Sequence, residues 1–446
     1  MNLNQVTLRH PIALARMILG KVRGRLVRRR TNPAVVVSGA AGPETAAPPP
    51  GRIDVKELIA RSSVEELNRS AEEYFSSLQN WDFHLAKPFG SMGDAPALLI
   101  NFATVLQGLR IAPGVHILEF GAGTGWAARY LTQLGCRVTL LDVSPTALEI
   151  ARELFRRHPV IGDQPSPEFL VFDGRQIDLP DRSVERILCF DAFHHAPNPD
   201  AVLAEFARVL VDGGIAAFAE PGPAHSQSEQ SQHEMRTFGV VENDIDIRAI
   251  WKTAQSVGFE DLKLAAFHIP PFHLGLEEYE SLLAGGEAYL RWAEQTRLFL
   301  GNVRNFFLKK KGQEPLDSRR LEGLKADIEI DIARPHVAPG ETIEAVARIT
   351  NTGGARWLPS GSGPGGVSLG SHLFDAQGKL LSHDFHWNDL IAPSRAIEPG
   401  ETVEISFKLP PLDPGHYRVE FDCVADRICW FRQAGSATVT LPVEVG

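Results

Sequence analysis

One segment constrains the fold more than any other: an apolar run at residues 117–120 passes directly into a glycine-rich turn, Gly-Ala-Gly-Thr-Gly, at residues 121–125. A helical pattern begins at Trp126. Glycine at alternate positions lets the backbone bend sharply and approach a ligand closely, which an ordinary turn does not need. The amides exposed at the start of the next helix favour a negatively charged or strongly polar group. The segment therefore predicts a ligand-binding strand–turn–helix unit.

Short apolar runs alternate with helical patterns around this unit. Strands are expected at residues 115–120, 137–141, 168–172, 186–190, 214–219, 262–268 and 304–309. Helices are expected at residues 126–134, 145–157, 200–210, 246–257 and 277–299. Such alternation with short connections predicts right-handed crossovers and a doubly wound sheet. Residues 111–312 are therefore expected to form an α/β domain built on a parallel, doubly wound sheet.

The rest of the chain differs from this domain in composition. Residues 1–32 form a basic arm, residues 33–51 a Pro/Ala/Gly-rich linker, and residues 52–110 show the periodicity of a helical cap. Beyond residue 326, about seven strand-like runs separated by Pro-Gly and glycine-rich turns predict an all-β sandwich of immunoglobulin-like type. No helix is expected within residues 326–446.

The charge distribution limits the partners. The chain has a net charge of −10, yet residues 1–30 hold eight of its 45 Lys and Arg residues and no Asp or Glu. The remainder is therefore strongly acidic, which argues against nucleic-acid binding. The arm has no apolar stretch long enough to span a bilayer. It is interpreted either as a tail or as an amphipathic segment compatible with peripheral contact with an anionic membrane.

Cysteine usage favours a reducing, cytoplasmic location. The four cysteines are scattered and form neither a disulfide framework nor a CxxC pair: Cys136, Cys189, Cys423 and Cys429. No spacing of Cys, His, Asp or Glu in the sequence indicates a metal site, so none is predicted. Nothing in the sequence indicates the oligomeric state.

The glycine turn must be distinguished from the dinucleotide-binding fingerprint GxGxxG. The third fingerprint position here is Trp126, whose indole would obstruct the close strand–helix packing of a pyrophosphate site. An NAD-linked sugar-modifying enzyme is therefore disfavoured. An acidic residue, Glu119, precedes the glycines, and GxGxG after an acid resembles motif I of class I S-adenosylmethionine-dependent methyltransferases.

Acids at the ends of the next strands extend this resemblance, which covers about residues 82–312. It implies that residues 111–312 have the family's α/β Rossmann-like fold with a seven-stranded mixed sheet. It implies that Asp142 accepts the ribose hydroxyls, Asp173 the adenine amino group, and that Asp191 lies near the sulfonium. The resemblance implies S-adenosylmethionine as cofactor, with the following binding residues: Glu119, Gly121, Ala122, Gly123, Gly125, Trp126, Asp142, Val143, Asp173, Gly174, Phe190 and Asp191. Taken singly, Asp142 could instead cap the helix at Pro145, and Asp173 could be a turn residue.

Methyl transfer to a neutral hydroxyl needs a base beside the in-line geometry. The candidate catalytic residues are His195, after the fourth strand, and His225, after the fifth. Either one could instead be a packing residue. Residues 226–246 are long and polar for a connection and are expected to form an acceptor-facing loop. The loop 81–93, with His84 and Lys87, is the expected lid.

The C-terminal region suggests the acceptor. Its pattern loosely resembles β-sandwich modules of bacterial surface-polysaccharide enzymes and exporters, on Asn351, Trp357, Asp375, Gly378, Pro414-Gly415-His416-Tyr417 and Trp430-Phe431. This resemblance implies methyl transfer to a hydroxyl of a saccharide or other glycan-linked small molecule, with the sandwich as a substrate-binding or assembly module. The alternative is a non-catalytic S-adenosylmethionine-binding scaffold whose sandwich binds a glycan or a protein partner.

Overall fold

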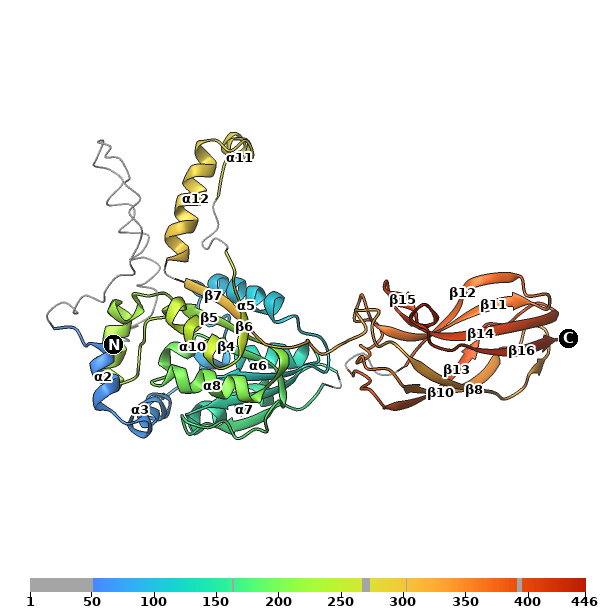
Figure 1. The fold of residues 1–446 in the computed structure, drawn as a ribbon, viewed down its shortest axis with the longest axis horizontal. Coiled ribbons are helices and arrows are strands. Elements are labelled where there is room, and N and C mark those ends of the chain that lie inside the picture. Colours follow the sequence, from blue (N-terminus) through green and yellow to red (C-terminus); the bar gives the residue numbers. More distant parts are fainter. Residues whose placement is uncertain (1–50, 163, 267–272, 302, 391–394) are drawn as a thin grey trace, which may run out of the picture.

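A computed structural model describes residues 51–446, apart from residues 163, 267–272, 302 and 391–394. The basic arm and nearly all of the linker lie outside the described residues. Among the residues that are described, no helix is long and apolar enough to cross a membrane. A helical cap and an all-β region lie at opposite ends of the long axis, with an α/β body between them (Figure 1).

The α/β body is built on one seven-stranded sheet, in the order β3-β2-β1-β4-β5-β7-β6. The strands are β1 (His116–Phe120), β2 (Arg137–Asp142), β3 (Glu168–Val171), β4 (Val184–Phe190), β5 (Leu210–Pro221), β6 (Phe259–Leu264) and β7 (Val303–Lys310). The first five pair in parallel, whereas β7 runs antiparallel to β5 and β6. The predicted Rossmann-like mixed sheet is therefore confirmed.

Helices cover both faces of this sheet, as alternation of the strand side chains requires. Ile117 packs with residues of α5 (Ala95–Leu109), α6 (Trp126–Gln133) and α7 (Pro145–Arg157) on one face. The next residue, Leu118, packs with α8 (Pro199–Val209) and α10 (Ile247–Ser256) on the other. Because β1 to β5 pair in parallel, all five end at one edge of the sheet, the carboxyl edge.

The cap contains α2 (Val55–Arg61), α3 (Val64–Ser76), the short α4 (Asp82–Leu85) and α9 (Glu229–Phe238). Helix α9 lies in the segment expected to be a loop, so that expectation was wrong. Ser228 caps the helix by accepting from the Ser231 amide, and Met235 packs with Leu67 of α3 in a small separate core. The long excursion after β5 is therefore part of the cap.

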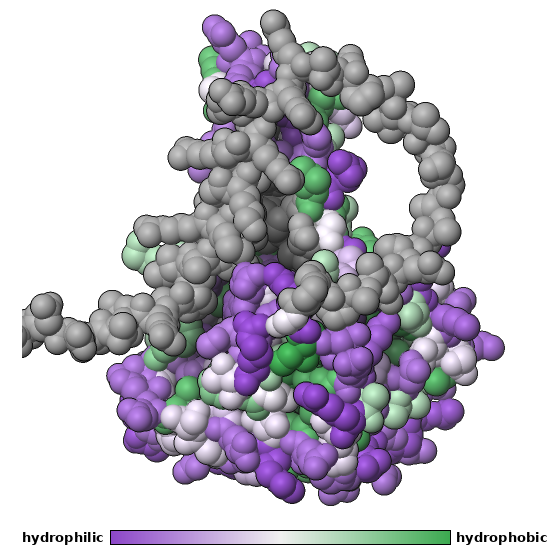
Figure 2. All heavy atoms as spheres, turned by 90° about the vertical axis from the view of Figure 1, so that its left-hand side faces the viewer, coloured by the Kyte–Doolittle hydropathy of each residue, from purple (hydrophilic) through white to green (hydrophobic). Residues whose placement is uncertain are grey.

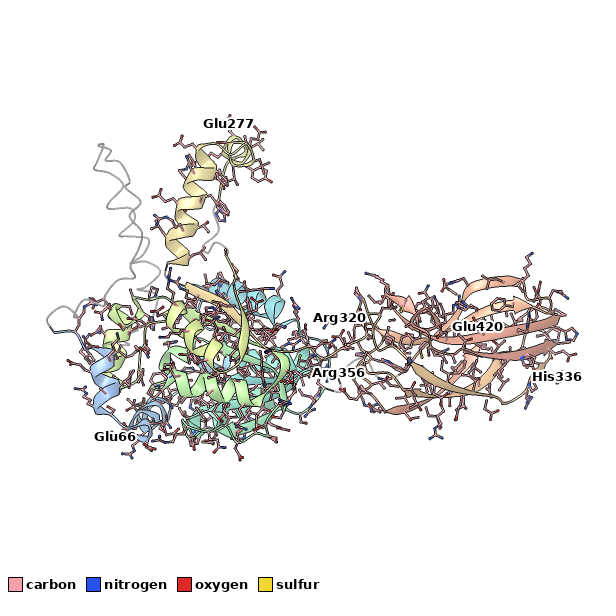
Figure 3. The ribbon with its side chains drawn as sticks, in the orientation of Figure 1. Glu66, Glu277, Arg320, His336, Arg356 and Glu420 are labelled. Carbon is pink, nitrogen blue, oxygen red and sulfur yellow. The ribbon has the colours of Figure 1, made fainter. Side chains whose placement is uncertain are left out.

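One expected helix between β6 and β7 is a hairpin of two: α11 (Leu276–Leu283) and α12 (Glu287–Leu300). Gly285, with φ of 72°, and Gly286 separate them. The hairpin projects from the body in Figure 1, with Glu277 near its tip in Figure 3.

The C-terminal region consists of two sheets, one ordered β13-β10-β8 and the other β12-β11-β14-β16-β9, with β15 paired to β14. Its strands are β8 (Ala326–Ile332), β9 (His336–Val337), β10 (Ile343–Asn351), β11 (Val367–Asp375), β12 (Leu380–Asp389), β13 (Thr402–Leu409), β14 (Gly415–Ala425), β15 (Cys429–Trp430) and β16 (Val439–Val445). The two sheets share one apolar core that includes Trp357, Phe421 and Phe431. The sequence prediction missed two of these strands, β9 and β12. It also placed a strand at residues 429–431, whereas Phe431–Ala434 forms a 3-10 turn.

The all-β region joins the body at the amino edge of the sheet, opposite the strand ends. Arg356 forms an ion pair with Glu185, near the start of β4, at 3.2 Å. Arg319 donates to the Ile111 carbonyl at 3.3 Å, and Leu358 packs into the core of the body. Figure 3 shows Arg320 and Arg356 where the two parts meet. The β-rich region is therefore attached on the side away from the carboxyl edge.

Candidate cofactor and acceptor site

The glycine turn after β1 has the left-handed backbone that its sequence predicts. Gly121, Gly123 and Gly125 have φ values of 63°, 51° and 74°. A Cβ on Gly121 would lie 2.5 Å from Cβ of Ala192, and one on Gly125 would lie 2.8 Å from Cβ of Ala151. A Cβ on Gly123 would meet nothing closer than Phe75 Cζ at 4.0 Å. The outer glycines therefore permit close packing, whereas the middle one faces space of the kind a bound ligand fills.

Glu119, in β1 just before the turn, is a buried acid with an unfilled hydrogen-bonding position. Its exposed fraction is 3%, and its Oε2 has no hydrogen-bond partner among the described residues. Burial raises the pKa of this carboxyl to about 8, against a backbone hydrogen bond from Ala128 that lowers it. An unpaired buried carboxyl oxygen is costly unless a ligand supplies a donor. A cationic amino group is the partner that suits it.

Asp142 lies against the glycine turn, as the cofactor-binding interpretation requires. Its Oδ2 accepts from the Gly123 amide at 2.7 Å, and its Oδ1 accepts from the Ser144 amide at 2.8 Å. Ser144, not Asp142, caps α7, because its Oγ accepts from the Ala147 amide at 2.9 Å. The helix-cap alternative for Asp142 is therefore wrong, and the acid is placed at the ligand edge.

Asp173 and Gly174 follow β3 beneath helix α3. The Oδ1 atom of Asp173 accepts from the amides of Arg175 and Gln176 at 2.7 and 2.9 Å, so the expected turn role is present. The Asn68 side chain donates to the Asp173 carbonyl at 2.8 Å. A Cβ on Gly174 would lie 2.4 Å from Val64 Cγ1, so α3 closes directly over this turn. The cap therefore covers the position expected for the adenine.

The remaining predicted cofactor residues differ in what they expose. Trp126 is buried, and its ring lies 5.2 Å from those of Phe102 and Phe190. The indole therefore belongs to the core, and Trp126 can meet a ligand only through its backbone. Ala122 is also buried, with its amide bonded to the Leu141 carbonyl. Val143 is partly buried beside Leu141, at the same edge.

On the acceptor side, Glu220 at the end of β5 organises the turn after β4. It accepts from the Phe193 amide at 2.8 Å and from the Ala192 amide at 3.2 Å. It also accepts from His194 Nδ1 at 2.8 Å. His194 and Glu220 are both buried, so this network holds the turn that presents Asp191 and His195.

His195 is the histidine that the fold presents most openly at this edge. Its Nδ1 lies 2.6 Å from the Val241 carbonyl, and its side chain is 45% exposed. A carbonyl only accepts, so Nδ1 carries the proton and Nε2 keeps its lone pair. Partial burial opposes protonation, but the Glu242 carboxylate and the Val241 carbonyl outweigh it and raise the pKa of His195.

His225 is more enclosed, and it is held by Glu242, a residue that sequence reasoning missed. His225 Nε2 lies 2.7 Å from Glu242 Oε2 and 3.3 Å from Ser231 Oγ. Burial would raise the pKa of Glu242, but the nearby His195 and His225 lower it to about 2. No sequence motif includes Glu242. The one indication of a role is its position within the polar segment after β5 that was expected to face the acceptor.

Of the two residues named in the expected lid, Lys87 lies near acids of the carboxyl edge, whereas His84 does not. Burial lowers the pKa of Lys87, opposed by the negative charges of Asp191 and Glu234, so its ammonium lies among the acids of this edge. His84 is buried beside aromatic rings, and burial lowers its pKa to about 4. Figure 2 views the cap end, where hydrophilic and hydrophobic side chains are intermixed over the described surface.

Comparison with known proteins agrees with this geometry. Residues 118–218 match the family described as "Methyltransferase domain". The malonyl-(acyl-carrier protein) O-methyltransferase of Serratia marcescens is 31% identical over 155 residues, covering 32% of this chain and 56% of that protein. The glycine/sarcosine/dimethylglycine N-methyltransferase of Actinopolyspora halophila is 30% identical over 202 residues, covering 40% of this chain and 33% of that protein. The chain thus spans only about a third to a half of the curated relatives it matches.

A solved structure of phosphoethanolamine N-methyltransferase 2 from Haemonchus contortus, with S-adenosylhomocysteine, is also similar. The identity is 18% and the TM-score 0.40, over 57% of this chain and 61% of that one. The family match falls on β1 to β5, the strands that carry the glycine turn and the acids. The strand order and the family match together indicate a methyltransferase domain with a Rossmann-like sheet in this part of the chain.

Proposed function

We propose that this chain is an active methyltransferase that methylates a hydroxyl group. The observation that carries the proposal is the convergence of three features at one sheet edge: open space at Gly123, an unpaired carboxyl at Glu119 and an accessible imidazole at His195. S-adenosylmethionine, when bound, supplies an electrophilic methyl group on a sulfonium sulfur. The protein must then hold a nucleophile in line and remove its proton.

His195 is the proposed general base. Its Nε2 keeps a lone pair because Nδ1 donates to the Val241 carbonyl, and Glu242 Oε1 lies 3.4 Å from Nδ1. These contacts fix the tautomer and the ring orientation, so that Nε2 can take the hydroxyl proton. His225 is less exposed, at 22%, and its Nε2 is already engaged by Glu242. His225 is therefore proposed as a residue that helps to hold Glu242 rather than as the base.

A saccharide is the proposed acceptor, as the sequence predicts. Lys87, Glu234 and Tyr74 lie close enough for their charges and dipoles to act on one another, and they offer both hydrogen-bond donors and acceptors. A polyhydroxylated acceptor suits such a polar surrounding better than an apolar one. The names of the similar proteins state different acceptors, a malonyl-(acyl-carrier protein) in one and glycine derivatives in another.

The all-β region is proposed to act in assembly or tethering rather than in direct acceptor binding. Its junction through Arg356 and Glu185 is at the amino edge, away from His195. Within one chain its surface therefore does not line the methyl-transfer site. We also propose that the all-β region is an immunoglobulin-like sandwich and that the basic arm, residues 1–32, contacts an anionic membrane.

A transfer assay tests the function directly. Full-length protein is incubated with methyl-labelled S-adenosylmethionine and a panel of free saccharides, lipid-linked saccharides and small hydroxyl compounds. We expect label in a saccharide with the wild-type chain, and loss of transfer with unchanged cofactor binding in His195→Gln. Cofactor binding without transfer to any acceptor would instead support the scaffold alternative.

A further inference from the structure

Three side chains from three separate segments converge beside the proposed base. His194 lies in the turn after β4, His225 in the turn after β5, and Glu242 in the stretch before α10. One ligand atom from each lies within 4.8 Å of the other two. Two imidazoles and one carboxylate are a donor set that binds divalent transition-metal ions well.

Glu242 provides a second, independent observation. Its side chain is 3% exposed, yet its Oε1 has no hydrogen-bond partner among the described residues. His195 Nδ1 lies 3.4 Å from this oxygen but donates to the Val241 carbonyl, and the carboxyl of Glu234 is a further neighbour of Glu242. A buried carboxylate oxygen without a hydrogen bond is available to a cation that can reach it.

The second nitrogen of His194 is also prepared for a ligand. Its Nδ1 lies 2.8 Å from the Glu220 carboxylate, which only accepts when ionised. The proton is therefore on Nδ1, and Nε2 keeps its lone pair. A carboxylate that orients a histidine in this way is the usual outer partner of a metal-bound imidazole.

We propose that a divalent transition-metal ion of the zinc class binds to His194, His225 and Glu242. In a tetrahedral site the ligand atoms lie about 3.3 Å apart, given zinc–ligand distances of about 2.0–2.1 Å. The three ligand atoms can reach that separation if the side chain of His225, the most exposed of the three, rotates. Its Nε2 then binds the metal in place of its hydrogen bond to Glu242. Three protein ligands leave one coordination position open. This inference goes beyond the proposed methyl transfer and requires neither the cofactor nor an acceptor.

The test is metal binding to the cofactor-free full-length chain, without a polyhistidine tag and after chelator treatment. Calorimetric titration with Zn²⁺ alone, and visible absorption with Co²⁺ alone, report affinity and coordination. We expect one equivalent to bind to the wild type, and binding to weaken in His225→Ala by more than the about 10–100-fold that losing an outer partner costs. His233→Ala, an exposed histidine on the neighbouring α9, is the matched control and should bind as the wild type does.

Glu242→Gln is the second variant, because it can keep a hydrogen bond to His225 while losing the charge. Far-ultraviolet circular dichroism and thermal unfolding establish that each variant is folded. A folded Glu242→Gln that binds Zn²⁺ as tightly as the wild type would overturn the proposal, as would a wild type that binds no stoichiometric metal. Because no cofactor is present, either result leaves the methyl-transfer proposal to its own assay.

Discussion

Glu119 predicts that cofactor binding releases a proton. Burial raises the pKa of this carboxyl from 4.5 to about 8. At pH 7 about nine in ten molecules of the free protein therefore carry a neutral Glu119. If the cationic amino group of the cofactor pairs with Oε2, the carboxyl ionises on binding. We expect release of about 0.9 proton per cofactor at pH 7, and affinity rising about tenfold per pH unit up to about pH 7 and levelling off above pH 8.

The assay is calorimetry of S-adenosylhomocysteine binding in two buffers that differ in ionisation enthalpy. Glu119→Gln provides the comparison, because its amide cannot titrate but keeps the shape of the side chain. The variant should lose this proton release and bind more weakly. Equal proton release in the wild type and in Glu119→Gln would refute the reasoning, since the proton would then come from another group.

The raised pKa of Glu119 also affects stability, which should fall with pH where cofactor affinity rises. Because the folded pKa lies above the ordinary value, Glu119 favours folding below pH 4.5 and this contribution is lost as the pH rises towards 8. The full loss corresponds to about 4.8 kcal/mol, and at pH 7 to about 3.3 kcal/mol. Cofactor-free Glu119→Gln should therefore be more stable than the wild type at pH 7, by denaturant unfolding. A variant that is both weaker in binding and less stable would contradict this account.

Three further perturbations test other parts of the structure. His195→Gln should lower kcat about 10²–10⁴-fold with cofactor affinity kept, and an unchanged kcat would exclude it as the base. Gly125→Ala should destabilise the chain by about 1–3 kcal/mol more than Gly435→Ala, because both glycines have positive φ but only a Cβ at position 125 would lie closer than 3 Å to other atoms. Equal melting temperatures of the two variants would contradict this. Arg356→Ala should lower stability by about 1–3 kcal/mol, because it leaves Glu185 buried without its ion pair. Cofactor affinity should stay unchanged, and weaker cofactor binding would show that the junction affects the carboxyl edge.

The sequence predicts those parts of the site that are local in the chain. Glu119 and the glycines lie in one short segment, and Asp142 ends the next strand, so one strand–turn–helix pattern places them together. Parallel strands then bring their acids to one edge without any further information. The alternation of strands and helices predicts a doubly wound sheet but does not determine the order of its seven strands.

Features that depend on contacts between distant segments could not be predicted. Glu242 meets His225 across 17 residues of an excursion that has no motif, so their pairing has no sequence signal. The indole of Trp126 is buried because Phe102 of α5 and Phe190 at the end of β4 pack on it. Strand β12 was missed because its side chains are mostly exposed and polar and its pairing with β11 is irregular.

The measurement that tests the central claim most directly is cofactor binding by the purified full-length chain. Gly123→Trp is the control, because position 123 faces space that the protein leaves open, so its side chain should fill the cofactor site. We predict saturable one-to-one binding of S-adenosylhomocysteine to the wild type, competed by S-adenosylmethionine, and no binding to folded Gly123→Trp. A folded wild-type chain that binds neither compound would contradict the assignment of this site.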